Sequence, residues 1–166
     1  GAGTLSYVWK KGTTPVGSNS PTYTIPAVAL TDAGNYSVEV TSSVCGMLAS
    51  SSVALTVNDT VKITSQPGNA TTCAGSGFSF SVSATGGGTL SYQWKKGGID
   101  IGGATNSTYA VSNASLSDAG SYSVLVTSSL CGSKTSATAT LTVNDTITIS
   151  TQPAGSTVCA GANVTF

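Results

Sequence analysis

Residues 116–124 read Leu-Ser-Asp-Ala-Gly-Ser-Tyr-Ser-Val. Asp and Gly at the start favour a turn, and the alternation of large apolar with small polar side chains that follows is typical of a strand with one buried face. Almost the same sequence stands at residues 30–38, which read Leu-Thr-Asp-Ala-Gly-Asn-Tyr-Ser-Val, 86 positions earlier. The chain therefore contains an internal repeat, whose period sets the size of the structural unit.

The repeat extends to both sides of this segment. Residues 90–97 read Leu-Ser-Tyr-Gln-Trp-Lys-Lys-Gly and match residues 5–12 at an offset of 85. Later landmarks keep an offset of 86, so one residue is inserted in the loop between Lys96 and Tyr109. A unit of this size, with short strands between turn residues, is typical of a β-sandwich domain. In the complete copy we predict strands at residues 61–65, 77–84, 90–96, 108–112, 121–127 and 135–143, with a short edge strand at 99–101.

Alternation also assigns side chains to the inner faces, because successive residues of a strand point to opposite sides. We expect the core to contain Phe78, Phe80, Val82, Leu90, Tyr92, Trp94, Tyr122, Val124, Val126, Ala137, Ala139, Leu141 and Val143. The chain then divides into residues 1–59, the C-terminal part of one domain, residues 60–145, a complete domain, and residues 146–166, the N-terminal strands of a next domain.

The composition excludes several classes of function. The 166 residues hold six Lys, no Arg, six acidic residues and no His, so the formal net charge is zero. We therefore expect no nucleic-acid partner, and no apolar run approaches the roughly 20 residues of a membrane helix. Without His, a Ser-His-Asp or Cys-His system is impossible, and the acidic residues form no local pair for acid-base catalysis. The chain is predicted not to be an enzyme and to need no cofactor.

Trp94 on the third predicted strand, followed by the segment 116–122, resembles the immunoglobulin pattern of a buried Trp and a tyrosine corner. Trp9 and the segment 30–36 repeat the pattern, so the resemblance covers the whole chain. It implies an all-β fold of tandem immunoglobulin-like sandwiches with Greek-key connections and about seven strands each. The structural core residues that it implies are Trp9, Trp94, Tyr36 and Tyr122.

The chain departs from the immunoglobulin pattern at one position. A Cys normally stands two residues after the corner Tyr, but here the residues are Val38 and Val124, and the second strand offers Phe80. The usual disulfide between the sheets is therefore absent. The amino-acid sequence of the repeat is also similar to immunoglobulin-like repeats of very large surface proteins in Bacteroidota, including gliding-type adhesins. This resemblance implies an extracellular or cell-surface location.

The four cysteines allow three pairings. Disulfides are the expected use in a secreted repeat protein, because single Cys residues without a neighbouring Cys or His cannot build a zinc site. We expect Cys73 to bond with Cys131, the one pairing that stays inside the complete domain. Cys45 and Cys159 are then predicted to pair with cysteines of neighbouring repeats.

The two ends of the chain are complementary parts of one domain. Phe166 corresponds to Phe80 and Gly1 to Gly86, so only the equivalents of residues 81–85 are missing between them. We predict that copies continue head to tail, with residues 146–166 of one copy completing the sandwich begun by residues 1–59 of the next. Cys159 would then approach the following Cys45. One continuous chain is favoured over strand donation between separate subunits.

Three surface features have alternative interpretations. Trp9 and Trp94 with their neighbouring tyrosines could stack sugars, but burial in the core is favoured by the immunoglobulin plan. The segments 58–59 and 144–145 each supply one amide and one carboxylate, which falls short of the six to eight oxygens that Ca²⁺ prefers, so no metal site is expected. Each is followed by a Thr and an apolar residue. The resulting triplet, Asp-Thr followed by an apolar residue, resembles the O-glycosylation motif of Bacteroidota. The resemblance implies Thr60 and Thr146 as acceptors.

Two functions are consistent with this reading. The first is a structural or adhesive array that acts as a stalk, spacer or fibre, with neighbouring repeats as its partners. The second is an adhesin module that binds a glycan or protein, and an accessory domain of a larger secreted enzyme stays open. A binding module should vary in its loops, whereas here the copies differ mainly between Lys11 and Tyr23. The structural array is therefore favoured.

Overall fold

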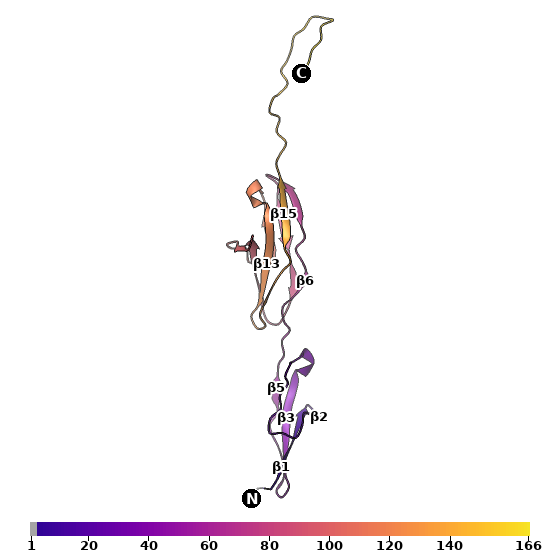
Figure 1. Cartoon of the computed structure of the whole chain (residues 1–166), viewed down its shortest axis with the longest axis vertical. Coiled ribbons are helices and arrows are strands. Elements are labelled where there is room, and N and C mark those ends of the chain that lie inside the picture. Colours follow the sequence, from indigo (N-terminus) through magenta and orange to yellow (C-terminus); the bar gives the residue numbers. More distant parts are fainter. Residues whose placement is uncertain (1–2) are drawn as a thin grey trace. The chain divides into compact units, whose positions relative to one another are not determined.

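The computed structural model describes residues 3–166. Gly1, which the repeat matches to Gly86, lies outside these residues. The fold is all-β, as predicted, and Figure 1 labels its strands along the chain. Contacts group the chain into two compact units. One unit combines the residues up to Thr64 with the segments Ala84–Ser91 and Val126–Lys134, and the other contains the rest of the chain. The two copies of the repeat are therefore described separately.

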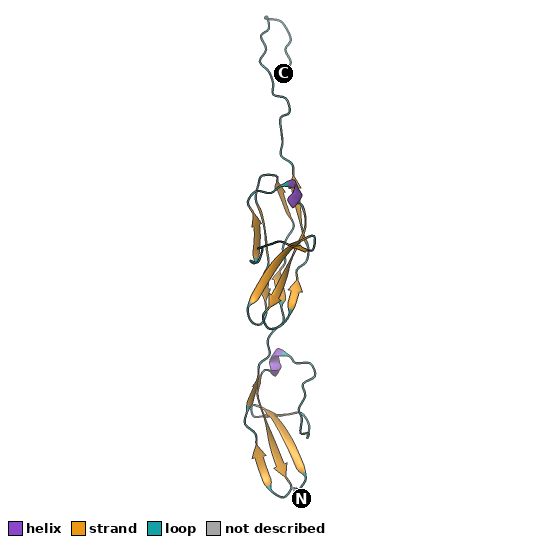
Figure 2. Ribbon diagram, turned by 90° about the vertical axis from the view of Figure 1, so that its left-hand side faces the viewer, coloured by secondary structure: helices purple, strands orange, loops and turns teal. Residues whose placement is uncertain are grey.

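The first copy forms a single antiparallel sheet with the order β2-β1-β3-β4, in which β5 also pairs with β3. Its elements are β1 (Leu5–Lys11), β2 (Thr14–Val16), η1 (Leu30–Asp32), β3 (Gly34–Ser42), β4 (Gly46–Ala49) and β5 (Val53–Leu55). Trp9 on β1 pairs with Val38 on β3, so the two landmark strands of the repeat lie side by side. Figure 2 shows this sheet as strands joined by loops.

The second copy forms the two layers of a sandwich. Its elements are β6 (Lys62–Ser65), β7 (Ala70–Cys73), β8 (Phe78–Ser81), β9 (Ser83–Thr85), β10 (Leu90–Lys96), β11 (Ile99–Asp100), β12 (Thr108–Val111), η2 (Leu116–Asp118), β13 (Gly120–Ser128), β14 (Ser133–Thr135) and β15 (Ala139–Asn144). One sheet has the order β11-β10-β13-β15-β7, with β14 on β13, and the other layer consists of the pairs β12-β8 and β6-β9. Strand β7 runs parallel to β15.

The core of the second copy lies between these layers. Trp94, Tyr122 and Phe80 are 0%, 1% and 2% exposed. The ring of Phe80 lies 5.1 Å from that of Tyr122 and 6.1 Å from that of Trp94. Phe80, which stands at one of the two positions of the immunoglobulin disulfide, thus packs against aromatic rings instead. The other largest buried side chains are Val124, Val126 and Leu141. Residues 61–144 therefore contain both layers and the core between them.

Two predicted elements differ in the structure. The predicted strand 77–84 is divided into β8, which pairs with β12, and β9, which pairs with β6. The predicted strand 135–143 is interrupted at residues 136–138, where Ala137 is exposed and its N–H donates to the side chain of Gln66 at 2.8 Å. Its assignment to the core was wrong. Strand β7 was not predicted at all.

Strands form only where a partner strand is present, because an unpaired backbone loses its hydrogen bonds. Residues 23–25 correspond to β12 and form no strand, and within residues 3–59 no segment corresponds to β8, the partner of β12. The same holds for residues 145–166, in which the predicted strands are not formed. Their counterparts β6 and β7 pair with β9 and β15, and residues 145–166 lie beside no strand.

Candidate functional site

The tyrosine corner is present in both copies. The Tyr122 hydroxyl donates to the carbonyl oxygen of Asp118 at 2.7 Å, and Tyr36 donates to the carbonyl of Asp32 at 2.7 Å. The Asp118 carboxylate accepts the N–H of Ser115 at 2.8 Å, and this bond lowers the Asp118 pKa. Burial, followed by the nearby Tyr109 and Asp118, raises the pKa of Tyr122 from 10.0 to about 12. Both copies therefore contain the hydroxyl-to-carbonyl hydrogen bond of a tyrosine corner.

The two tryptophans differ in exposure. Trp94 is fully buried, and its indole N–H donates to the carbonyl of Asn106 at 2.9 Å. A fully buried ring offers no face on which a sugar could stack. Trp9 makes the equivalent bond to Ser20 at 3.0 Å but is only half-buried. The same residue type therefore lies in a closed core in one copy and at an open face in the other.

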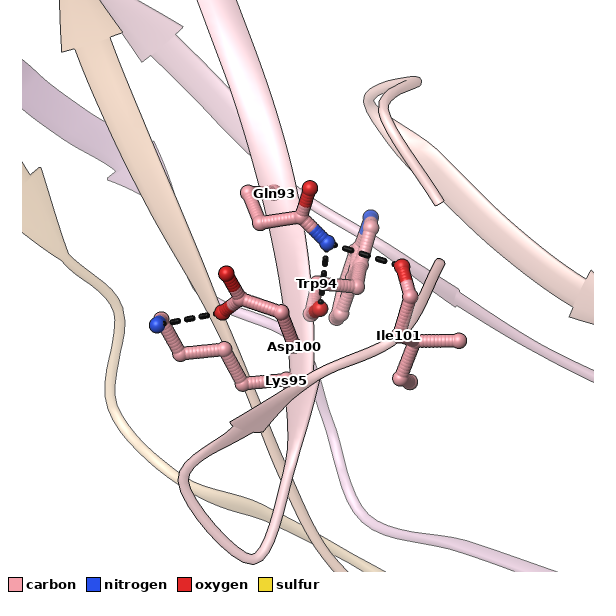
Figure 3. Close-up of polar contacts among 5 residues, drawn as sticks. All are labelled: Gln93, Trp94, Lys95, Asp100 and Ile101. Atoms are coloured by element: carbon pink, nitrogen blue, oxygen red, sulfur yellow. Dashed lines mark hydrogen bonds and ion pairs between the residues drawn. The ribbon is translucent and has the colours of Figure 1, made fainter. Parts of the chain in front are cut away.

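The hairpin β10–β11 lies in the region where the copies differ most (Figure 3). The Gln93 side-chain amide donates to the carbonyls of Trp94 at 2.9 Å and Ile101 at 2.8 Å, which ties the returning chain to β10. Lys95 forms an ion pair with Asp100 across the turn. The first copy has Val8 in place of Gln93, so these side-chain hydrogen bonds occur in the second copy and have no equivalent at Val8.

A buried serine was missed by the sequence analysis. Ser136 is 9% exposed, and its hydroxyl accepts the N–H of Val124 at 3.0 Å and donates to the carbonyl of Ala137 at 2.8 Å. Ser50 accepts the N–H of Val38 at 3.0 Å in the first copy. The recurrence of the serine at an offset of 86 was a signal that could have identified it.

The first copy has an open apolar face. A groove of about 280 Å³ is lined by Trp9, Tyr23, Ile25, Tyr36, Val53, Ala54 and Leu55. Val53 is 62% exposed, whereas its counterpart Ala139 is 0% exposed. The ring centroids of Trp9 and Tyr23 lie 6.0 Å apart, close to the 6.2 Å between those of Trp94 and Tyr109. The open face thus has the aromatic arrangement of a core.

The second copy shows what covers the equivalent face. Phe78 lies 6.1 Å from Tyr109 and 6.1 Å from Tyr122, and Phe80 packs on Trp94. Strand β8 therefore closes this side of the sandwich. In the repeat, Phe78 and Phe80 correspond to Val164 and Phe166, and Phe166 is 79% exposed. The chain thus contains an open face and an apolar segment of matching spacing.

Comparison with known proteins identifies the fold family. The model described as the Immunoglobulin I-set domain matches residues 61–143, half of the chain. The chain belongs to this family. The I-set domain accounts for the tyrosine corner and the buried Trp94.

Relatives of known name are similar to parts of the chain. The decoration protein of Escherichia phage T5 is 46% identical over 74 residues, which are 44% of this chain and 45% of that protein. A structure of a three-immunoglobulin fragment of titin has a TM-score of 0.65 at 18% identity, covering 85% of this chain and 56% of its own. Extracellular domains 3–5 of Drosophila OTK give 0.59 at 21% identity, with 85% and 51% covered. The chain spans less than half of the curated relative and little more than half of these structures, which show the fold alone.

The four cysteines are unpaired in the structure. Within the I-set domain, Cys73 pairs in register with Asn144, beyond the Gly120 end of β13, whereas Cys131 follows the opposite end at Ser128. The nine residues of β13 separate these ends by about 27 Å, and a disulfide needs Cα atoms about 4.4 to 6.8 Å apart. The structure therefore contradicts the predicted bridge between Cys73 and Cys131.

The same register argues against a bridge inside the domain that the two chain ends were predicted to form. Cys159 and Cys45 are the counterparts of Cys73 and Cys131, so they would lie at opposite ends of that sandwich. The cysteine pairing was predicted from the fact that both residues belong to one domain. It did not take into account the end of the domain at which each Cys lies.

The junction segments are exposed. Thr60 and Thr146 both lie at the surface, and the Thr146 N–H donates to the side chain of Asp145 at 2.8 Å. Asp59 forms a hydrogen-bonded ion pair with Lys62 at 2.8 Å, which lowers the Asp59 pKa. Within residues 3–166, no group of three His, Cys, Asp or Glu side chains could hold a metal ion. In the same part of the chain, no helix is long and apolar enough to cross a membrane.

Proposed function

We propose that the chain is part of a tandem array of I-set domains that acts as an extracellular stalk, spacer or fibre. The observation that carries this proposal is the open apolar face of the first copy. An open sheet with exposed aromatic side chains and unpaired edges invites aggregation, so a neighbouring segment must cover it. Its role is structural and not enzymatic.

The occupant that we propose is a segment equivalent to residues 146–166 of another copy. In this segment Val164 and Phe166 have the spacing of Phe78 and Phe80, which cover the matching face in the complete domain. The domain boundaries at residues 59 and 60 and at residues 145 and 146 follow from this pairing. Each copy then shares one domain with its neighbour, either within one continuous chain or by strand donation.

The comparisons support a displayed structural module. The titin structure is a run of three immunoglobulin domains, the OTK structure contains extracellular domains, and the phage relative is named a decoration protein. The proposal extends this likeness to a very large cell-surface protein of the Bacteroidota type, with O-linked sugar on Thr60 and Thr146.

A second candidate is an adhesin module that binds a glycan or protein. It is favoured by the variable hairpin region of the complete domain, where a polar hollow of about 350 Å³ is lined by Gly102, Gly103, Ala104, Asn106, Thr108, Tyr109 and Ala110. Binding of a glycan array by residues 60–145, lost when residues 97–108 are replaced by residues 12–22, would favour this candidate.

The array is tested on the full-length product purified from its natural source. Electron microscopy of negatively stained particles should show a rod whose length increases with the number of repeats in the sequence. A compact particle without repeating segments would contradict the proposal. Surface labelling of intact cells with an antibody against residues 60–145 tests the extracellular location in the same material.

A further inference from the structure

We infer that the cysteines form disulfides between consecutive domains, from the position of Cys73 in one domain to the position of Cys131 in the domain that follows. This inference rests on the proposed tandem array, and it assigns each junction a covalent tie. It replaces the bridge inside one domain, which the strand register contradicts. A junction has two halves, and the structure shows each half once.

The first half lies where the complete domain begins. The Cys131 thiol donates to the carbonyl oxygen of Asn58 at 3.6 Å. This segment is held in place, because the Gly87 N–H donates to the carbonyl of Asp59 at 2.9 Å. A Cβ on Gly87 would lie 2.7 Å from the Cβ of Asn58, so the two backbones pack closely. The thiol of the turn after β13 therefore faces the chain that enters the domain.

The second half lies where the complete domain ends. Cys73 is the register partner of Asn144 in the parallel ladder of β7 and β15. The N–H of the next residue, Ala74, donates to the carbonyl oxygen of Asn144 at 2.8 Å. The Cys73 side chain is exposed and its thiol is unpaired. A cysteine thus lies beside the chain that leaves the domain.

Asn58 and Asn144 are the same position of the repeat, in the sequence Val-Asn-Asp-Thr at both junctions. A complete junction therefore contains one Asn whose carbonyl oxygen faces Ala74 of the domain before it and the thiol of the domain after it. One carbonyl can accept both bonds, since it has two lone pairs. The two contacts place the Cys73 Cα within at most about 11 Å of the following thiol sulfur.

This proximity makes a disulfide geometrically accessible. Because both cysteines approach the same oxygen, their Cα atoms can reach the separation of about 4.4 to 6.8 Å that a disulfide requires. Within one domain the corresponding cysteines lie at opposite ends of β13. Each cysteine of this chain then has its partner in an adjacent domain, which agrees with four unpaired thiols here. Cys45 bonds to the domain before it and Cys159 to the domain after it.

The bond forms by oxidation of two thiols. Each sulfur loses a proton, the S–S bond forms, and the two electrons pass by thiol–disulfide exchange to an oxidant that carries a disulfide and becomes a dithiol. Oxidising compartments outside the cytoplasm supply oxidants of this class. The product ties two domains at a second point beside the backbone, so bending at the linker is restricted.

The test uses two copies of residues 60–145 joined from Asp145 to Thr60, which preserves Val-Asn-Asp-Thr at the junction. Each copy contains a complete core and should unfold cooperatively. The junction variant carries Cys131→Ser in the first copy and Cys73→Ser in the second. The matched control has the two substitutions exchanged between copies, so its remaining thiols lie at the outer ends of the pair. A single domain with both cysteines is the second control.

After oxidation by glutathione disulfide at high dilution, the intact mass of the junction variant should fall by two hydrogens in a monomer. Both controls should keep two titratable thiols. The inference is overturned if the folded junction variant keeps its thiols, if it forms only disulfide-linked dimers, or if the single domain closes its own bridge. The two copies are joined artificially in this test, so a missing disulfide would contradict the inference but not the proposed array. The array is tested separately by the electron microscopy experiment.

Discussion

Replacement of Tyr122 by phenylalanine in residues 60–145 removes a hydroxyl that is buried at the tyrosine corner and donates to the carbonyl of Asp118 at 2.7 Å. The carbonyl then loses its partner, and leaving a buried acceptor unsatisfied costs about 1 to 3 kcal/mol. For a domain of this size 1 kcal/mol lowers the melting temperature by roughly 4 to 8 °C. Calorimetry at pH 7 measures the change, with Tyr92→Phe on β10 as the matched control.

The same variant tests the titration of Tyr122. Its pKa in the folded domain is raised to about 12 from 10.0, so its contribution to stability is complete below pH 10 and is lost as pH rises toward 12. In the parent domain the free energy of unfolding should therefore decline over this range, and Tyr122→Phe should reduce the decline. A melting temperature equal to that of the Tyr92→Phe control, together with an unchanged alkaline decline, would refute the role of the corner.

Three further predictions concern the junctions and the 3-10 turn. Gly87→Ala should lower the free energy of unfolding by about 1 to 3 kcal/mol through overpacking. The control Gly68→Ala, with no atom within 4 Å of the added Cβ, should change the free energy of unfolding by less than about 0.5 kcal/mol. Equal effects of the two variants in urea titrations would contradict the close packing at the linker. Asp118→Ala should destabilise the domain at neutral pH and flatten the acid limb of its stability curve, because the lowered pKa of Asp118 gives stability above the unfolded pKa that is lost as pH falls. A variant with an unchanged acid limb would argue against this. Intact-mass analysis of natively purified material should show hexose-type additions on Thr60 and Thr146, and a mass equal to that of the bare polypeptide would remove the glycosylation proposal.

The sequence predicted the strands whose alternation continues through the whole element. Residues 90–96 were placed correctly because Trp94 is buried, Leu90 and Tyr92 are half-buried, and β10 pairs with both β11 and β13. Ala137 was misplaced because the last predicted strand is interrupted, and alternation has no meaning across such a break. Strand β7 was missed because Ala-Thr-Thr-Cys has little apolar contrast, and its pairing with β15 uses the backbone.

The cysteine pairing could not be obtained from spacing alone. Two residues of one domain can lie at either end of its strands, and only the register of β7, β13 and β15 shows which end holds each cysteine. For the first copy, the repeat shows which residues correspond to the core of the second copy, but the contrast between the exposed Val53 and the buried Ala139 required the structure.

The central claim is that a segment like residues 146–166 closes the open face of residues 3–59. It is tested most directly by one hybrid chain made of residues 146–166, the linker Ser-Val-Ser-Ala-Thr copied from residues 81–85, and residues 1–59. Trp9 is the one tryptophan of this hybrid, so its fluorescence reports the open face alone. We predict cooperative unfolding and acrylamide protection of Trp9 equal to that of Trp94 in residues 60–145. Solvent-accessible Trp9 emission without a cooperative transition, as expected for residues 1–59 alone, would contradict the account.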